Sequence, residues 1–345
     1  MTDQWFLRPA KSIDQVDIDS ARSHQLKLTK PPGSLGQLED IAVSFCAWQQ
    51  SLAPTCEHIQ IAVFAADHGV CAQGVSAFPQ QVTTQMVHNF TRGGAAISVL
   101  AKQLKAKFKV VNMGLISAIE DTDGLVNTPI MFGTNDFTQQ AAMSQETVLK
   151  ALNVGRTQID SKADLFIGGD MGIGNTSSAS AIYSVLLKQA PEITVGPGTG
   201  VDKDGQARKR KALYQALNLH AEQMTSPIEI LGRIGGLEIA ALVGAYIACA
   251  QAGVPILVDG FITTAAALLA CKINPSTRDW MMFSHKSAEP AHTLALESLK
   301  ARPLLDLNMR LGEGSGAAVV APIIISALAL HCNMATFDSA GVSES

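Results

Sequence analysis

Residues 163–172 read ADLFIGGDMG, a short apolar run that ends in glycines and an aspartate. An apolar run of this length that leads into a helix-like stretch is typical of a strand in a parallel sheet. Similar runs occur at IQIAVFAADHG (59–69), FKVVNMG (108–114) and VPILVDG (254–260), and in weaker form at WMMFSH (280–285). Helical patterns occupy roughly residues 93–106, 144–161, 176–189, 203–223, 237–252, 261–272 and 288–300. This alternation predicts an α/β fold.

The two ends of the chain differ from this middle part. Residues 12–52 read as two polar-faced helices around KPPGSLG, and residues 315–334 read as an apolar helix. No strand pattern lies between either region and its terminus, so we expect these ends to pack together. The predicted parts are a large α/β domain over 55–310, with a Rossmann-like parallel sheet flanked by helices, and a smaller helical lobe built from 1–54 and 311–345.

Composition narrows the classes of function. The chain has 345 residues, 47% hydrophobic and 16% charged, which allows a sizeable core. Its net charge is −4 and its only basic cluster is 208–211, so we expect no nucleic-acid partner. No basic segment followed by an apolar one begins the chain, and Gly, Pro or polar residues interrupt the apolar runs, so we expect no membrane span and a cytoplasmic location. Six cysteines without a C-x-x-C pair indicate buried thiols rather than disulfides or a zinc site.

A glycine-rich loop with the features of an anion site follows the 163–172 run. In GGDMGIGNTSSASA, glycines lead into a polar helix start, where free N–H groups and the helix dipole favour a phosphate. We predict Asn175 as the N-cap, although a strand-to-helix turn whose Ser and Thr only cap the helix remains an alternative. The predicted phosphate residues of this loop are Gly172, Gly174, Asn175, Thr176, Ser177 and Ser178.

A second glycine loop, GPGTGVD (196–202), precedes the basic helix. We predict that Gly198, Gly200 and Lys209 also serve the phosphate, since one cation suits a single phosphate. The alternative is that the basic run is simply solvated.

Two carboxylates occupy glycine-rich positions. Glu313 lies in MRLGEGSGAA (309–318), whose G-x-G-x-x-A spacing imitates a dinucleotide fingerprint, but an acid there would repel a pyrophosphate. Asp170 lies at the end of the 163–172 run. Carboxylates so placed suit a reaction that moves a proton and stabilises positive charge, as in glycosyl transfer. Asp67 and His68 form another pair after a strand, with a structural role equally open.

The segment SHKSAEPAH (284–292) resembles a metal motif at first sight. Pro290 breaks any single helical face that would join His285, Glu289 and His292, and their spacing is not an established one. We therefore expect no metal.

Nine motifs in order along the chain carry a family resemblance. They are KPPGSLGQLE (30–39), ADHGV (66–70), TRGGAAI (91–97), GGDMGIGNTSSASA (168–181), GPGTGVD (196–202), DGFITTAAAL (259–268), SHKSAEPAH (284–292), LDLNMRLGEGSGAA (305–318) and MATFDSAGVSES (334–345). Together they resemble the nicotinate-nucleotide:dimethylbenzimidazole phosphoribosyltransferases. The resemblance implies transfer of phosphoribose from nicotinate mononucleotide to 5,6-dimethylbenzimidazole, giving α-ribazole 5′-phosphate for the lower ligand of cobalamin, and nicotinate.

The resemblance also implies roles for residues. The family's catalytic base maps onto Glu313, which would take the benzimidazole proton while the other ring nitrogen attacks C1′ with inversion. A second family acid maps onto Asp170, one methylene shorter than the Glu of other members. The acceptor-base pocket maps onto Phe78, Met86, Met171 and Leu311, whose apolar side chains suit a flat methylated ring.

The resemblance further implies a homodimer and no cofactor, with nicotinate mononucleotide and dimethylbenzimidazole or a related base as the small-molecule partners. Two other functions remain open from the residues alone. An NAD-dependent oxidoreductase would use the α/β pattern and G-x-G-x-x-A, although that loop follows no N-terminal strand. A non-catalytic nucleotide-binding protein would use the same loops without a working carboxylate.

Overall fold

A six-stranded parallel sheet forms the centre of the molecule. The computed structural model describes residues 4–198 and 200–343. The strands are β1 Ile59–Ala66, β2 Lys107–Gly114, β3 Leu125–Asn127, β4 Leu165–Met171, β5 Ile256–Val258 and β6 Met281–Phe283, in the order β3-β2-β1-β4-β5-β6. All neighbouring strands pair in parallel. The α/β prediction and its five strands are thereby confirmed, and the three-residue edge strand β3 is one that the pattern missed.

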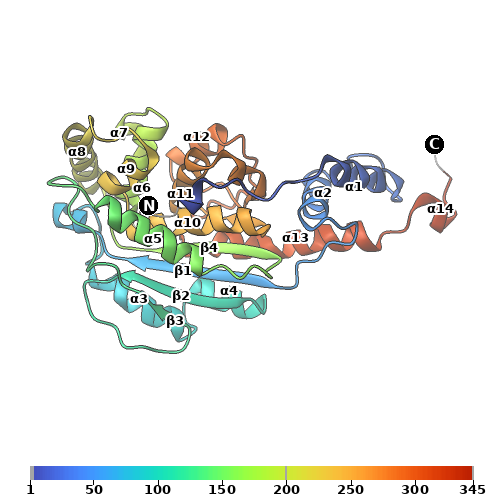
Figure 1. The fold of residues 1–345 in the computed structure, drawn as a ribbon, viewed down its shortest axis with the longest axis horizontal. Coiled ribbons are helices and arrows are strands. Elements are labelled where there is room, and N and C mark those ends of the chain that lie inside the picture. Colours follow the sequence, from blue (N-terminus) through green and yellow to red (C-terminus); the bar gives the residue numbers. More distant parts are fainter. Residues whose placement is uncertain (1–3, 199, 344–345) are drawn as a thin grey trace.

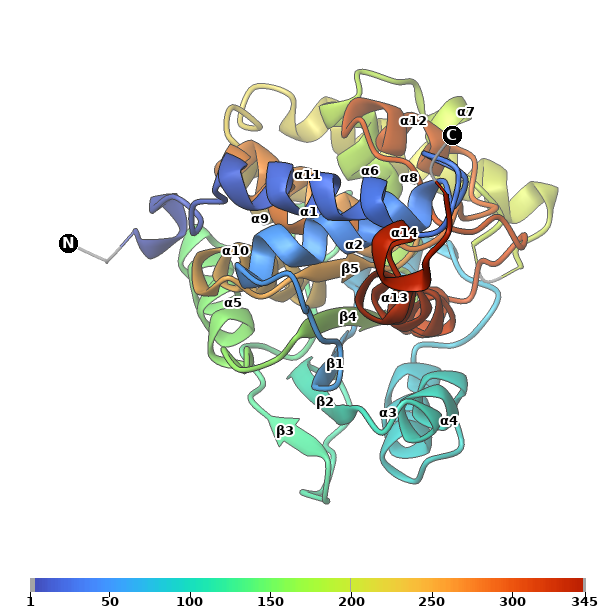
Figure 2. The same ribbon diagram turned by 90° about the vertical axis from the view of Figure 1, so that its right-hand side faces the viewer.

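Helices cover both faces of this sheet. They are α1 Gln15–Lys27, α2 Gln37–Gln49, α3 Gln81–Thr91, α4 Ala96–Gln103, α5 Gln145–Thr157, α6 Asn175–Leu186, α7 Pro191–Thr194, α8 Lys203–His220, α9 Pro227–Ile234, α10 Leu237–Ala252, α11 Phe261–Ile273, α12 Ala291–Ser298, α13 Ser315–Asn333 and α14 Phe337–Ala340. Short 3-10 helices are Trp5–Leu7, Gly69–Gln73 and Pro275–Trp280. Figures 1 and 2 show α5 and α10 on one side of β1 and β2, and α3 and α4 on the other.

The central strands and α10 form the core. All eight residues of β1 are buried, as expected for a parallel strand covered on both faces. Helix α10 packs against β1, β2, β4 and β5 on one side and against α5 and α11 on the others. A helix enclosed in this way is apolar all round, which is the composition of α10. The core fixes the sheet and thereby the loops at the carboxyl ends of its strands.

Helices from the two ends of the chain pack together, at the right of Figure 1. Helix α2 contacts both α1 and α13, and α13 also contacts α4 and β4. Residues 5–11 behave differently, because the indole of Trp5 donates to Asn153 of α5 and the Lys11 amide donates to Ala250 of α10. Residues 5–11 thus contact helices of the larger predicted part, and the predicted division into two parts stays a proposal.

Helix α13 bears on the expectation that no segment spans a membrane. Among the described residues it is the one helix that could cross a membrane by length and composition, with 19 residues and a mean hydropathy of 1.9. Pro322 and Ser326 interrupt its apolar run, as the sequence indicated, although the helix continues through both. More than half of its apolar window, 56%, is buried inside the protein. Its contacts with β4, α2 and α4 account for the apolar composition, as in a core helix.

The cysteines also differ in part from the prediction. All six are free, and Cys46, Cys56 and Cys249 are buried. Cys332 is exposed near the end of α13, and two others are half-buried. The expectation of buried thiols thus holds for only three of the six.

Candidate active site

The strand order places a crevice between β1 and β4. After β1 the chain adds β2 and β3 on one side of that strand. After β4, which lies on the other side of β1, it adds β5 and β6 in the opposite direction. In open α/β sheets, ligands bind beyond the carboxyl ends of the strands at such a switch point. Here β1 and β4 end side by side, with Ala65 paired to Met171. The segments that follow these strands are therefore the first place to look for a site.

A cavity of about 450 Å³ lies at this edge of the sheet. Its lining residues come from the ends of β4, β5 and β6, from α3 and from the loop before α13. They are Phe78, Val82, Met86, Asp170, Met171, Gly172, Ile173, Asn175, Thr176, Gly198, Gly260, Phe261, Ile262, His285, Ser287, Glu289, Arg310, Leu311, Gly312 and Glu313. A larger groove, about 710 Å³, lies between residues 4–7 and helices α5 and α9, away from the strand ends. The smaller cavity is the candidate site because it combines the strand ends with the predicted residues.

Glu313 enters the cavity from an unusual backbone. It has a φ of 67°, and its neighbours Gly312 and Gly314 have φ values of 86° and 87°. A left-handed glutamate costs about 1 kcal/mol or more, and such strain concentrates at functional sites. The loop rests on Gly169 of β4, where any side chain would overlap the Glu313 carbonyl. The side chain is 6% exposed and its Oε2 accepts from the Ile97 amide at 3.4 Å. Burial raises the pKa of the carboxyl, and the Ile97 N–H partly opposes this shift.

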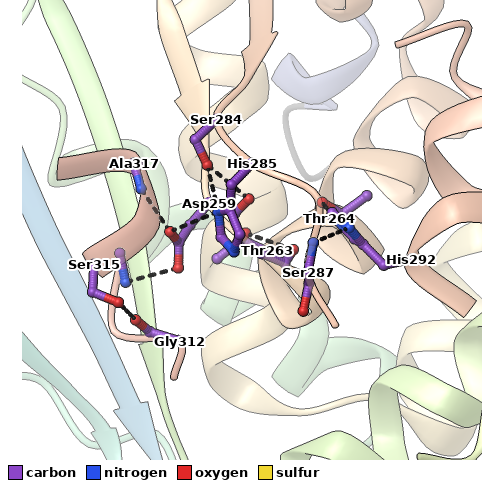
Figure 3. A network of polar contacts seen from close by, with 12 residues as sticks. Asp259, Thr263, Thr264, Ser284, His285, Ser287, His292, Gly312, Ser315 and Ala317 are labelled. Carbon is purple, nitrogen blue, oxygen red and sulfur yellow. Dashed lines mark hydrogen bonds and ion pairs between the residues drawn. The ribbon is translucent and has the colours of Figure 1, made fainter. Parts of the chain in front are cut away.

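Asp259, after β5, holds the backbone of this loop. Its Oδ2 accepts from the Gly314 amide at 3.1 Å and its Oδ1 accepts from the Ala317 amide at 2.8 Å (Figure 3). A carboxylate at the N-terminus of α13 satisfies free N–H groups and complements the helix dipole. Burial raises the pKa of Asp259 to about 7, against the opposing effect of these amides. Asp259 was not predicted from the sequence, because its partners lie more than 50 positions away along the chain.

Asp170 lies beside the Glu313 loop. A methyl group added at Gly312 would lie 3.5 Å from the Asp170 carboxyl oxygens. Oδ2 of Asp170 accepts from the Asn175 side-chain amide at 2.9 Å. Burial, and then the charge of Asp259, raise the pKa of Asp170 to about 8. The carboxyl is therefore largely protonated near neutral pH, unlike an ordinary aspartate.

We expect Asp170→Asn to stabilise the protein increasingly as pH rises. Between the ordinary pKa near 4 and the folded value of about 8, the folded state keeps a proton that the unfolded chain releases, so the free energy of unfolding of the wild-type protein falls by up to about 1.4 kcal/mol per pH unit. Asparagine titrates in neither state. Urea unfolding at about pH 5 and about pH 8 should show a stability difference that widens with pH. A difference that stays constant would show that Asp170 is ionised in the folded protein.

The start of α6 differs in detail from the prediction. The N-cap is Gly174, with a φ of 97°, and Asn175 is the first helical residue. Asn175 does not cap because its side chain turns to Asp170. The side chains of Ser177 and Ser178 are fully buried and do not line the cavity, and the Ser178 hydroxyl bonds to Gly235 and His68. Gly172, Asn175 and Thr176 do line it.

A buried lysine joins the two glycine loops. Lys209 of α8 is 2% exposed, and its Nζ donates to the Thr176 hydroxyl at 2.8 Å. A methyl group at Gly198 would lie 2.6 Å from this nitrogen, so the ammonium lies where both loops meet. Burial lowers the pKa of Lys209 to about 8, and Glu289 opposes the shift. Gly200 is exposed and does not line the cavity.

Two charged residues at the same end of the cavity were missed from the sequence as binding residues. Glu289 accepts from the Gly198 amide at 2.9 Å, and Arg310 donates to the Gly198 carbonyl at 3.0 Å. Burial raises the pKa of Glu289, and the charge of Lys209 opposes this shift. Arg310 and the start of α6 line this part of the cavity, and Lys209 is bonded to Thr176 without lining it itself. A lysine, an arginine and a helix start are groups that bind a phosphate.

Part of the cavity lining is apolar. All four side chains predicted for the acceptor pocket lie along it, with Phe78 before α3, Met86 on α3, Met171 on β4 and Leu311 before Glu313. Val82, Ile173, Phe261 and Ile262, which the sequence analysis did not select, extend the same surface. Flat apolar surface of this kind suits an aromatic ring.

The two histidines of residues 284–292 form hydrogen bonds with different partners. His292 accepts from the Ser287 amide at its Nδ1 and contacts the Thr264 hydroxyl through Nε2 (Figure 3). His285 bonds to Ser284 through Nδ1. Within the described part of the chain, no group of three or more His, Cys, Asp or Glu residues could hold a metal ion.

The cavity thus combines groups that suit an anion, apolar side chains and the buried carboxyl of Glu313, a combination that suits an α/β enzyme acting on a phosphorylated substrate. A family model described as a phosphoribosyltransferase matches residues 10–342. The nicotinate-nucleotide–dimethylbenzimidazole phosphoribosyltransferases of Pseudomonas syringae pv. syringae (strain B728a) and Xanthomonas axonopodis pv. citri (strain 306) are 51% and 49% identical to the chain, over 100% of it and 99% and 100% of their own lengths. A crystal structure of the enzyme of that name from Thermus thermophilus is 42% identical, with a TM-score of 0.91, over 96% of this chain and 100% of the other.

The chain therefore belongs to the nicotinate-nucleotide–dimethylbenzimidazole phosphoribosyltransferase family, whose members are glycosyltransferases of the pentosyltransferase type. The family and the α/β fold confirm what the nine motifs implied. The family model and the alignments with these relatives both cover nearly the whole chain.

Proposed function

We propose that the protein transfers the 5-phosphoribosyl group of nicotinate mononucleotide to 5,6-dimethylbenzimidazole, giving α-ribazole 5′-phosphate and nicotinate for the lower ligand of cobalamin. The observation that carries the proposal is the buried Glu313 in one cavity whose lining also offers groups suited to a phosphate and apolar side chains suited to an aromatic ring. The relatives' names state the same two substrates.

The chemistry follows from the charges at this centre. One ring nitrogen of the base attacks C1′, the bond from C1′ to the pyridinium nitrogen breaks, and its electron pair leaves with nicotinate. The attacking ring becomes positive and its N–H proton passes to the Glu313 carboxylate. Attack from the face opposite the leaving group converts the β configuration to α. A carboxylate whose pKa burial raises is a stronger base for this proton and also stabilises the charge that develops.

The phosphate site of the proposal consists of the α6 start together with Lys209 and Arg310. Gly172, Asn175 and Thr176 face the cavity, while Gly174 permits the turn that begins the helix. Lys209 and Arg310 supply the positive charge that a dianionic phosphate requires. The pyridinium is already a cationic leaving group, so no general acid is needed at the other side.

Incubation with nicotinate mononucleotide and dimethylbenzimidazole tests the reaction. We expect chromatography to detect ribazole phosphate and nicotinate in equal amounts, and neither product when the base is omitted. Release of nicotinate without ribazole phosphate would show a hydrolase instead. A non-catalytic binding protein would give neither.

We also propose a homodimer in the cytoplasm. The exposed apolar residue Ile325, on the outer face of α13, fits burial of this helix against a second copy. Light scattering at micromolar protein should give twice the chain mass of 36.4 kDa, and a monomer mass would contradict the dimer.

A further inference from the structure

His285 lies at a fixed place in the wall of the cavity. It follows β6 at the carboxyl end of the strand and is 3% exposed. A methyl group at Gly260 would lie 3.3 Å from its ring, and one at Gly316 would overlap the ring. The two glycines, at the starts of α11 and α13, make room for the imidazole and hold it in one position.

The hydrogen bonds of Ser284 determine which nitrogen of His285 carries the proton. The Ser284 hydroxyl donates its only hydrogen to the Asp259 carbonyl at 3.0 Å, so it accepts from Nδ1 of His285 at 2.9 Å (Figure 3). Burial lowers the pKa of His285, which keeps the ring neutral near pH 7. A neutral imidazole with its proton on Nδ1 has a lone pair on Nε2. Among the residues that the structure describes, Nε2 has no hydrogen-bond partner, while the residue lines the cavity.

The segment 284–289 runs between the phosphate region and the Glu313 loop. At one end, Glu289 accepts from the Gly198 amide in the phosphate region. At the other end, His285 lies beside Gly316, three residues after Glu313. A ribotide with its phosphate at Lys209 and its C1′ near Glu313 places the ribose along this segment. This placement rests on the proposed function.

We propose that His285 recognises the ribose of the mononucleotide by accepting a hydrogen bond from its 2′-hydroxyl at Nε2. The choice of hydroxyl follows from position, because C2′ is bonded to the reacting C1′ and His285 lies at the Glu313 end of the segment. A hydrogen bond at this hydroxyl strengthens as the ribose gains oxocarbenium character, so His285 serves both recognition and rate. A neutral acceptor also discriminates against a ribose that lacks the donor.

The test compares three substrates in the full-length protein. The probes are nicotinate mononucleotide and its 2′-deoxy and 3′-deoxy analogues, with dimethylbenzimidazole as acceptor. Deoxy analogues differ from the ribotide in intrinsic reactivity, so each variant is compared with the wild-type protein. The 2′ ratio is kcat/KM for nicotinate mononucleotide divided by kcat/KM for its 2′-deoxy analogue, and the 3′ ratio is defined in the same way with the 3′-deoxy analogue. We expect His285→Ala to lower the 2′ ratio by about 10-fold, the value of one good hydrogen bond, and to leave the 3′ ratio unchanged. His285→Gln, which keeps an acceptor oxygen, should restore part of the 2′ ratio.

A matched control is available on the same segment. Both ring nitrogens of His292 are bonded within the protein, to the Ser287 amide and the Thr264 hydroxyl. His292→Gln should therefore leave the 2′ ratio unchanged even where it lowers stability. A 2′ ratio that is the same in His285→Ala and in the wild-type protein, or a fall in the 3′ ratio instead, overturns the inference. Absence of transfer from unmodified nicotinate mononucleotide by the wild-type protein would instead refute the proposed function.

Discussion

Replacement of Glu313 by Gln should lower kcat by about 100- to 10,000-fold while the KM for nicotinate mononucleotide changes little. Gln has the size of Glu and the same backbone requirement, so the left-handed loop and its bonds to Asp259 should persist. The amide cannot take the benzimidazole proton, and it offers no negative charge to the ring as positive charge develops. The measurement is steady-state transfer to dimethylbenzimidazole with ribazole phosphate as the readout.

An acceptor without an N–H proton distinguishes a role of Glu313 as general base from a structural role. A benzimidazole methylated at one nitrogen can attack through the other and has no proton to lose, so Glu313→Gln should lose much less activity with it. Glu297→Gln, at an exposed glutamate of α12, is the matched control and should keep wild-type turnover with both acceptors. Near wild-type turnover of Glu313→Gln with dimethylbenzimidazole would remove Glu313 from the role of essential base.

The pattern of the sequence predicted the strands that carry the site because each lies in a run of apolar residues. β3 and β6 are both three-residue edge strands, but β6 is apolar throughout (MMF), whereas β3 (LVN) ends in the exposed Asn127 and has no buried residue. Helix α3 was missed because Val82, Thr83 and Thr84 are β-branched residues near its start, which lower helix propensity. That helix supplies part of the apolar lining of the cavity, through Val82 and Met86.

Residues of the candidate site were predictable where the pattern of residue types within one short segment is distinctive. Glu313 is distinctive because an acid interrupts a glycine loop, and the resemblance supplied its role. Ser178 shows the limit, because its hydroxyl is taken by His68, itself bonded to Glu238 at 2.8 Å, a contact across 170 positions of the chain. Local sequence cannot show such a network, so polar residues of one loop cannot be sorted into those that face the ligand and those that face the core.

Replacement of Lys209 by Met should lower kcat/KM for nicotinate mononucleotide by about 10- to 100-fold, mostly through KM, which is the value of a charge-assisted hydrogen bond. Methionine fills a similar volume among the neighbours of this buried side chain but offers neither charge nor donor. The wild-type KM should rise as pH increases through about 8, because the free enzyme loses the ammonium proton there, and the KM of the variant should lack this rise. Initial rates from about pH 6 to about pH 9 measure both effects.

A substrate without the phosphate shows whether the fall in kcat/KM of Lys209→Met comes from a lost contact with the phosphate. Nicotinate riboside lacks the group that Lys209 is proposed to bind, so the wild-type protein and Lys209→Met should use it equally poorly. Lys211→Met changes an exposed lysine of the same helix and should leave kcat/KM for the mononucleotide at the wild-type value. An equal loss on the riboside and the mononucleotide would mean that Lys209 acts by holding Thr176 and the α6 start in place, through its 2.8 Å hydrogen bond, rather than by binding the phosphate.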